Sequence, residues 1–282
     1  MASGLFSALR ILVRGGGDLA SGAIYRLHKL GCAVLVLELP APLFVRRAVS
    51  YGEAVYADAI VIEGVRARHA QDLAHAQRLM AEGDIAVLVD PQAQTIHAWR
   101  PQVVLDARMA KTALDTRISD APLVIGMGPG YEVGRDCHAI IETKRGHTLG
   151  RVLWQGRAEA DTGEPDAVLG MSYERVIRAP QDGHVHSVAQ IGERVQAGQV
   201  IARMEQSDIL APFEGVVRGL IHERPYVSAG TKIGDLDPRN KRQNCFTISD
   251  KALSVGGGVL EALLSAPDLS TWLSAPKLAH EA

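Results

Sequence analysis

The chain has 282 residues, 47% of them hydrophobic and 5% aromatic, and its formal net charge at pH 7 is −2. This length is enough for one large or two ordinary domains, and the near-neutral charge argues against nucleic acid and anionic membranes as partners. The 28 glycines and the few aromatic residues favour an α/β or β architecture over a helical bundle.

The first predicted unit is a strand, a helix and a second strand. Residues 11–13 form a short apolar run, and the apolar residues of 19–30 recur with helical spacing up to Gly31. Residues 33–38 are an uninterrupted apolar run that ends in an acidic residue, which is typical of a buried parallel strand. Together these segments predict a βαβ unit.

The turn inside this unit fits a phosphate-binding pattern. Gly15, Gly17 and Ala20 match G-x-G-x-x-[GA], in which glycines let the backbone approach a pyrophosphate at a helix N-terminus. Glu38 stands where an acidic residue contacts a ribose hydroxyl in dinucleotide-binding folds. The alternative is a strand–helix turn without a ligand, with Asp18 as the helix cap and Glu38 as an ordinary strand end.

Further strands are expected at 58–65, 85–91, 103–111 and 123–130, with a helix over 70–80. Polar or glycine-rich segments follow these apolar runs, and ligands of open α/β sheets bind outside the carboxyl ends of the strands. If a phosphate binds there, we expect Asp18 to cap its own helix and to leave two glycine amides facing the ligand. The predicted cofactor-binding residues are Gly15, Gly16, Gly17, Asp18, Ala20, Glu38, Gly126, Gly128 and Gly130.

Residues 134–151 are the segment richest in ionisable groups. A strand over 137–143 would place Cys137, Ala139 and Ile141 on one face, and Asp136, His138, Ile140 and Glu142 on the other. The second face is either an acid/base or metal-binding surface or, more commonly, a salt-bridged edge. The sequence assigns no catalytic residue, and whether the protein is an enzyme stays open. The candidates are Lys111, His138, Glu142, Arg145 and His147.

An internal repeat occupies the C-terminal half. Residues 177–204 and 209–236 align at an offset of 32, and each copy contains A-P-x-x-G followed by V-x-x-G. The repeat predicts a small β module, and it resembles the biotinyl/lipoyl barrel-sandwich hybrid domain. In that family a lysine seven residues before the second A-P carries the cofactor. Met204 stands at that position and 204–209 contains no lysine, so neither biotin nor lipoate is expected.

Three histidines of this module form a weaker pattern. His184 and His186 share a strand face and could bind a metal together with His222, but solvated histidines are the favoured interpretation. No metal is expected. After the module, 245–249 resembles a strand, and Gly256–Gly258 precede a short apolar helix at 259–264. These glycines are either a second anion site or, as we prefer, a close-packing contact with the first domain.

The expected fold class is α/β: a Rossmann-like, mainly parallel sheet with a second small all-β barrel-sandwich hybrid domain. The expected domains are 1–172 for nucleotide binding, 173–238 for the repeat, and 239–282 as a segment packing back on the first domain. The three isolated cysteines predict free thiols in a reducing cytosol. The N-terminal apolar stretch is too short for a signal peptide, and no run reaches the ~20 residues of a membrane span. A cytoplasmic protein is therefore expected.

Four longer motifs carry a family resemblance that covers residues 9–264. They are VRGGGDLASGAIYRLHKLG, GMGPGYEVGRDCHAIIETKRGHTLGR, GDLDPR and SDKALSVGGGVLEALL. The chain resembles the YqeB-like accessory proteins of the selenium-dependent molybdenum hydroxylase system. This resemblance implies a role in the maturation of such hydroxylases and a nucleotide-binding domain joined to a barrel-sandwich module. It implies no catalytic residue.

Three functions remain open on the sequence. The first is an accessory factor that binds a nucleotide-bearing molecule, such as a dinucleotide or a molybdopterin dinucleotide, and has a molybdenum hydroxylase or its maturation proteins as partner. The second is an NAD-dependent oxidoreductase, since Glu38 suits an unphosphorylated ribose. The third is a non-catalytic scaffold that docks a partner enzyme through the β module. Homo-oligomerisation is left open.

Overall fold

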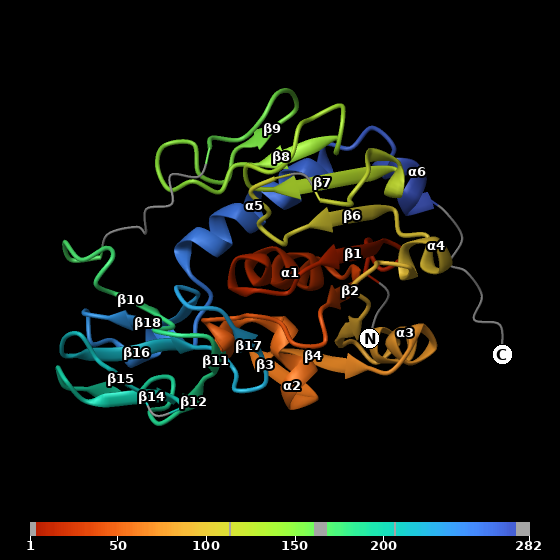
Figure 1. The fold of residues 1–282 in the computed structure, drawn as a ribbon. Coiled ribbons are helices and arrows are strands. Elements are labelled where there is room, and N and C mark those ends of the chain that lie inside the picture. Colours follow the sequence, from red (N-terminus) through yellow and green to blue (C-terminus); the bar gives the residue numbers. More distant parts are fainter. Residues whose placement is uncertain (1–3, 113, 161–167, 206, 275–282) are drawn as a thin grey trace.

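One large sheet of nine strands organises the N-terminal part of the chain, in the order β3-β4-β5-β2-β1-β6-β7-β8-β9 (Figure 1). The computed structural model describes residues 4–112, 114–160, 168–205 and 207–274. Residues 1–3, at the start of the stretch considered as a signal peptide, and position 206, in the lysine-free hairpin, lie outside these ranges. The strands are β1 Arg10–Arg14, β2 Ala33–Glu38, β3 Ala59–Ile62, β4 Val65–Ala70, β5 Ile85–Val89, β6 Val103–Asp106, β7 Leu123–Met127, β8 Ala139–Ile141 and β9 Val152–Leu153.

Helices cover both faces of this sheet. They are α1 Asp18–Leu30, α2 Ala54–Ala57, α3 Leu73–Ala81, α4 Thr95–Trp99, α5 Asp250–Leu264 and α6 Leu269–Ser274. Short 3-10 turns lie at η1 Arg47–Val49, η2 Tyr51–Glu53, η3 Ile118–Asp120 and η4 Arg242–Cys245. One apolar cluster joins the sheet to α1 and α5, and a second joins the opposite face to α3 and α4. Burial on both faces explains why the inner strands are continuous apolar runs.

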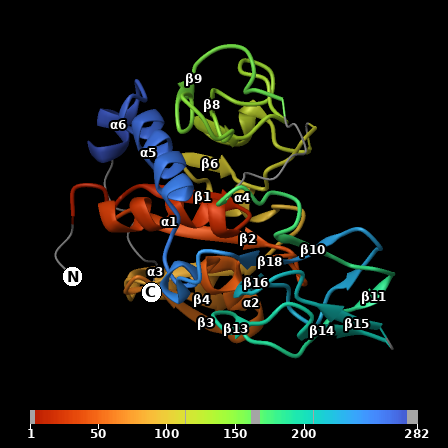
Figure 2. The same cartoon turned by 90° about the vertical axis from the view of Figure 1, so that its left-hand side faces the viewer.

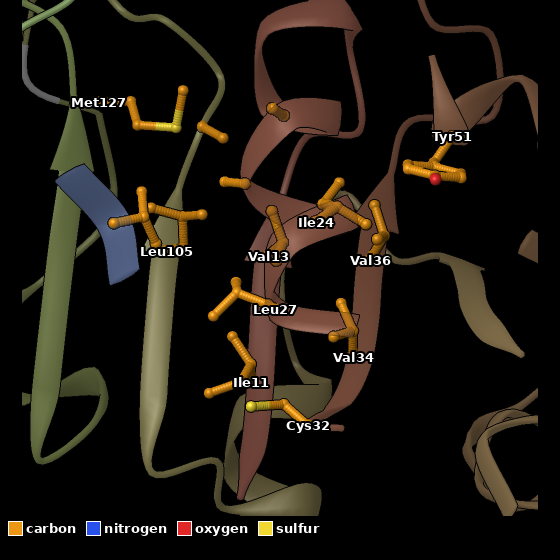
Figure 3. Close-up of a cluster of buried hydrophobic side chains, with 14 of the residues drawn as sticks. Ile11, Val13, Ile24, Leu27, Cys32, Val34, Val36, Tyr51, Leu105 and Met127 are labelled. Atoms are coloured by element: carbon orange, nitrogen blue, oxygen red, sulfur yellow. The ribbon is translucent and has the colours of Figure 1, made fainter. Parts of the chain in front are cut away.

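The cluster under α1 shows how the periodicities of strand and helix meet. Ile11 and Val13 of β1, with Val34 and Val36 of β2, face Ile24 and Leu27 of the helix (Figure 3). The remaining inward residues of the same strands, such as Leu12 and Leu35, belong to the cluster on the other face. The alternation places Glu38 on the α1 face of the sheet and Arg14 and Asp106 on the opposite face.

The contact between α1 and α5 brings the two ends of the described chain together (Figure 2). A Cβ atom on Gly22 would lie 2.0 Å from the carbonyl oxygen of Ala252, and one on Gly256 would lie 2.5 Å from that of Gly22. The helices therefore touch through their backbones. Gly256 lies inside α5, which begins at Asp250, so the expected helix over 259–264 starts nine residues earlier than the sequence predicts.

The second part of the chain is a β module built from short strands. They are β10 Val176–Arg178, β11 Gly183–His184, β12 His186–Ser187, β13 Arg194–Val195, β14 Val200–Met204, β15 Ser207–Leu210, β16 Gly215–Leu220, β17 Tyr226–Val227 and β18 Lys232–Asp237. They pair as three antiparallel sheets, in the orders β10-β18-β16-β13, β11-β17 and β12-β14-β15. A separate apolar cluster, from Ile177 to Leu236, fills the module. Figure 1 places it beside β3 and α2.

The expected fold class, a Rossmann-like mainly parallel sheet with a barrel-sandwich hybrid domain, is wrong. The large sheet is mixed, because β3 pairs antiparallel with β4 at one edge and β9 pairs antiparallel with β8 at the other. The module forms three separate antiparallel sheets, and the four-stranded one combines strands from both repeat copies. A sequence repeat predicts the strands of each copy, but it does not specify how they pair across copies.

Local predictions fail where backbone turns are hidden in apolar runs. Residues 58–65 are not one strand, because Glu63 (φ 47°) and Gly64 (φ 79°) turn the chain back as a two-residue hairpin. Such a short connection joins only antiparallel strands. The strand expected at 245–249 is also wrong, since Cys245 is the last residue of η4 and the following residues lead into α5 without forming a strand. Cys137 lies outside β8, so it does not share the face of Ala139.

The three cysteines are buried free thiols in this structure. Burial raises the pKa of Cys32 and of Cys137 to about 12, so neither thiol ionises readily near neutral pH. Within the part of the chain that the structure describes, every helix is too short or too polar to cross a membrane.

Candidate functional site

The candidate site lies at the carboxyl edge of the large sheet, where the strand order reverses. From β1 the chain moves to β2, crosses to the outer edge at β3 and comes back inward through β4 to β5. It then crosses to the other side of β1 as β6. The loops after β1 and β6 therefore leave the sheet next to each other but in opposite directions, which is the position where open α/β sheets bind ligands.

A charged network occupies this reversal on the α3 face. The Arg14 guanidinium donates to Thr116 Oγ1 at 2.7 Å and to Asp115 Oδ2 at 2.8 Å. Arg108 lies 2.6 Å from Asp106 and 2.8 Å from Asp115, and the Thr116 hydroxyl donates to Asp106. Burial acts to raise the pKa of Asp106, but the bonds from Arg108 and Thr116 hold it below its ordinary value. Two arginines thus balance two carboxylates, and the network fixes the loop after β6.

The Glu38 side chain accepts a hydrogen bond from the first glycine loop. The amide of Gly16 donates to Glu38 Oε1 at 2.5 Å, and the amide of Leu39 donates to Oε2 at 3.0 Å. The carboxylate is 7% exposed, and burial raises its pKa although both amides act to lower it. The sequence places Glu38 correctly beside the glycines, but it does not predict this internal bond. A role toward a ribose stays a prediction.

Helix α1 begins at this loop without a side-chain cap. Its N-cap residue is Gly17, and the expectation that Asp18 caps its own helix is wrong. Asp18 instead lies 3.3 Å from a guanidinium nitrogen of Arg46. In contrast, Asp72 caps α3 and Ser249 caps α5 through their side chains. The first turn of α1 therefore presents backbone N–H groups that no capping side chain accepts.

A segment after β2 packs against the glycine loop. The amide of Gly52 donates to the Gly16 carbonyl at 3.0 Å, and a Cβ atom on Gly16 would lie 2.7 Å from that amide nitrogen. This close approach requires glycine at position 16. A Cβ atom on Gly17 would meet only the Phe44 ring, at 3.7 Å, which is an ordinary contact.

The second glycine loop is filled by the protein's own atoms. A Cβ atom on Gly126 would lie 2.6 Å from the Tyr131 ring, and one on Gly130 would lie 2.4 Å from the Ala110 carbonyl oxygen. Gly128 adopts a φ of 91°, which favours glycine. A cofactor role for these three glycines stays a prediction, while their observed contacts are with neighbouring loops.

The candidate catalytic residues are spread along β8 and its flanking loops. His138 precedes the strand, where its Nδ1 accepts from the Val124 amide at 2.9 Å, and burial lowers its pKa. Glu142 follows the strand and accepts from the amides of Lys144 and Glu159 at 2.7 and 2.8 Å. The length of β8 therefore separates these two groups.

The other candidates lie on exposed loops or in ion pairs. Arg145 pairs with Asp250 at 2.9 Å, at the start of α5. Lys111 follows β6 and His147 lies between β8 and β9, and both are exposed. Catalytic roles for these residues stay predictions.

The histidines of the β module do not converge. The His222 ring stacks on Tyr56 with 3.9 Å between centroids, while His184 meets Tyr226 edge-on at 5.4 Å. Across the ranges that the structure describes, no group of three or more His, Cys, Asp or Glu residues is arranged to hold a metal ion.

Several residues of this edge are not predicted from the sequence, namely Arg14, Arg46, Arg108 and Thr116. Arg14 carried a signal, because a charged residue that ends a buried strand needs a partner at the sheet edge. A pocket of about 560 Å³ lies instead near the amino ends of β6 and β7, lined by residues such as Arg100 and Asp120. It contains none of the predicted site residues.

Comparisons with known proteins give a clear sequence relative and weak structural likenesses. No protein-family model matches the chain. The uncharacterized protein YqeB of Escherichia coli strain K12 is 44% identical over 254 residues, which are 90% of this chain and 47% of that protein. The chain thus spans about half the length of this curated relative, and in that sense its sequence is YqeB-like.

Among solved structures, the chain is similar to an aspartoacylase family protein from Mesorhizobium loti, with a TM-score of 0.25 and 11% identity over 81% of this chain and 84% of that one. A succinylglutamate desuccinylase/aspartoacylase from Rhodobacter sphaeroides gives a TM-score of 0.24 and 12% identity, over 81% and 85%. At these values the likeness assigns neither a fold nor an activity to the chain.

Proposed function

We propose that this YqeB-like chain binds a nucleotide-bearing small molecule at the carboxyl edge of the large sheet and acts as an accessory factor in molybdenum hydroxylase maturation. One observation carries the binding proposal: Gly17, the N-cap residue of α1, gives the helix no side-chain cap, and it lies beside the reversal between β1 and β6. The maturation role is what the family resemblance implies, and the relative is itself described as uncharacterized.

The physical basis is the unbalanced charge of an uncapped helix end. Helix α1 has 13 residues, and its first-turn N–H groups and its dipole favour an anion. Gly17 adds no side chain that would shield these groups. A phosphate is the anion that suits several N–H donors at once, so a nucleotide phosphate is the ligand group we assign to this end of α1.

The bonding of the buried carboxylates favours binding over catalysis. Asp106, Glu38 and Glu142 each accept two or more hydrogen bonds from protein groups. Their oxygen atoms hold loops in place at the edge of the sheet. This supports an accessory binding protein over the alternative of an NAD-dependent oxidoreductase, which needs a proton donor or acceptor beside its substrate.

Calorimetry with NAD, NADP, CTP and a molybdopterin dinucleotide tests the binding proposal. Gly17→Val should fold, because the φ of Gly17 is −65° and a Cβ atom there has an ordinary contact. We expect it to lose at least tenfold in affinity for the ligand that the wild type binds, since the side chain covers the helix end. Gly257→Val is the matched control, because a Cβ atom on Gly257 meets nothing within 4 Å.

Two results would overturn the binding proposal: no binding of any of these ligands to the wild type, or equal binding by Gly17→Val. The maturation role needs a separate measurement. The activity of a selenium-dependent molybdenum hydroxylase, expressed with and without this chain, should fall in its absence. Turnover of a substrate by the purified chain with NAD would instead support the oxidoreductase.

A further inference from the structure

A group of basic side chains lies where the β module meets the segment after β2. We name it the basic seam, and it consists of Arg46, Arg175, Arg218, Lys232 and Arg239, with Asp18, Asp235 and Asp237. The two parts of the protein touch closely here. A Cβ atom on Gly219 would lie 2.4 Å from the Val45 carbonyl oxygen, and Arg47 Nε donates to the Leu220 carbonyl at 2.8 Å.

Two carboxylates of the module pair with arginines of the basic seam in the part of the chain that the structure describes. Asp235 lies 2.7 Å from Arg175 and 3.2 Å from Arg218, and Asp237 lies 2.6 Å from Arg239. The neighbouring Asp250 is itself paired with Arg145 at 2.9 Å. Among the described residues, Arg46, Arg218, Lys232 and Arg239 therefore lie with Asp18, Asp235 and Asp237, and Asp235 is shared with Arg175.

Arg46 connects the seam to the first turn of α1. Its side chain is 8% exposed, one guanidinium nitrogen lies 3.3 Å from Asp18, and another donates to the Asn244 carbonyl at 3.0 Å. Its Nε is buried, and no described residue accepts a hydrogen bond from it. The Nε atom of Arg218 is also buried, and no described residue accepts a hydrogen bond from it; the nearest carboxylate oxygen of Asp237 is 4.0 Å away. A buried donor without an acceptor is costly, and an anionic ligand would supply acceptors.

The charges of the seam also act on one another. The pKa of Arg218 is lowered by desolvation and then by the charge of Arg46. The pKa of Lys232 is lowered by desolvation, while Asp235 and Asp18 act to raise it. The charge of Asp18 therefore acts on Arg46, 3.3 Å away, and also on the exposed Lys232. The Asp18 side chain is 41% exposed, so solvent reaches this end of the seam.

We propose that the β module completes the ligand site, so that the basic seam binds a second phosphate group of a ligand whose first phosphate lies at the first turn of α1. This inference rests on the proposed function and specifies its ligand as a diphosphate-bearing molecule. Several basic groups in one place suit a polyanion better than a single phosphate. The Asp18 carboxylate is paired with one guanidinium nitrogen of Arg46, and it therefore competes with the ligand phosphate for Arg46.

Binding of inorganic pyrophosphate and inorganic phosphate at low ionic strength tests the inference without a nucleoside. The wild type should bind pyrophosphate at least tenfold more tightly than phosphate. Lys232→Gln should weaken pyrophosphate binding about tenfold, because it removes one charge of the seam. Asp18→Asn should strengthen it about tenfold, since the competing carboxylate is gone. Arg203→Gln is the control, because Arg203 is 59% exposed on β14 and pairs only with the exposed Asp208 among the ion pairs described.

The outcomes separate this inference from the proposed function. If Gly17→Val loses nucleotide binding while Lys232→Gln and Asp18→Asn bind pyrophosphate as the wild type does, the proposed function stands and the seam is no part of the site. If pyrophosphate binding depends on Lys232 but nucleotide binding is insensitive to Gly17→Val, the proposal that the basic seam and the first turn of α1 form one site is wrong. Absence of pyrophosphate binding to both the wild type and Asp18→Asn also overturns the inference.

Discussion

The two glycine-rich loops at the carboxyl edge of the large sheet look alike in sequence and differ in structure. The loop after β1 leads into a long helix, and its Gly17 has room for a side chain. The loop after β7 leads into no helix. Gly126, near the end of β7, lies close to Tyr131, and Gly130, in the loop, lies close to Ala110. A glycine cluster in the sequence therefore suggests a close approach to the backbone. Whether protein atoms or open space surround each glycine depends on the tertiary structure.

Support for the two regions is similar, although their glycines differ. Glu38 accepts two amide hydrogen bonds beside the first loop, and Glu142 accepts two after β8, beside the second. Both glutamates are buried at strand ends. The two glutamates are therefore alike in burial and bonding, but only Glu38 binds an amide of a glycine loop, since the amides bound by Glu142 belong to Lys144 and Glu159.

The largest loss of unfolding free energy should come from a methyl group at Gly126, in β7 just before the second loop. Gly126→Ala would place a Cβ atom 2.6 Å from the Tyr131 ring, in a strand with no exposed residue. Overpacking of this kind costs about 3 kcal/mol of unfolding free energy. Urea unfolding followed by circular dichroism measures it. A loss under about 1 kcal/mol would mean that the Tyr131 ring can shift, and that the second loop is less filled than it looks.

Truncation of either glutamate should lower the free energy of unfolding by less than Gly126→Ala does. Glu38→Ala and Glu142→Ala each leave two amides without their acceptor, and we expect a loss of about 2 kcal/mol in each case. Only Glu38→Ala should also weaken nucleotide binding, by about 1–3 kcal/mol, because it releases the first loop. Equal effects of both variants on calorimetric affinity would contradict the distinction between the loops.

The pH dependence of Glu38 gives a smaller effect with a definite sign. Burial raises its folded pKa above the ordinary 4.5, so the folded state holds a proton more tightly than the unfolded state does. The glutamate therefore lowers stability progressively as the pH rises from about 4.5 through its raised pKa. Glu38→Gln does not titrate, so its stability relative to the wild type should increase across that interval. Urea midpoints at several pH values measure this, and a constant difference would refute the assignment.

The smallest expected effect is the change in unfolding free energy caused by Gly17→Ala. A methyl group there has an ordinary contact with Phe44 and an allowed φ of −65°, so we expect a change within about 0.5 kcal/mol. A loss of 2 kcal/mol or more would show that the first loop is as tightly filled as the second. Thermal unfolding beside Gly126→Ala is the direct comparison.

Much of the large sheet follows from local sequence. Strands β2 and β5 are predictable because each is a continuous apolar run between turn residues. The hairpin of β3 and β4 is not, since its turn contains Glu63 in a left-handed conformation that the sequence does not signal. The extent of α5 is also hidden. Its glycines argue against a helix locally, yet Gly256 is needed inside one for contact with α1.

The site is less predictable than the sheet because its contacts are long-range. The position of Glu38 follows from the strand pattern, whereas its bond to Gly16 depends on how α1 seats the loop. Arg46 lies in a segment without periodicity, and its carbonyl partners Asn244 and Thr247 are 198 and 201 residues away. No spacing rule reaches that far.

The backbone contact between α1 and α5 has a consequence for the order of folding. Arg26 of α1 bonds to Leu253 of α5 across 227 residues of chain. During synthesis, α1 and the first strands leave the ribosome long before the helix that covers them, and the whole β module emerges in between. The apolar face of α1 beside Gly22 therefore stays uncovered until α5 has been synthesised. Contacts between residues so far apart in sequence slow folding. The β module precedes α5 in the chain, so it leaves the ribosome while the α1 face of the sheet still lacks that helix, and a chaperone that shields this face would act on the nascent chain during that interval.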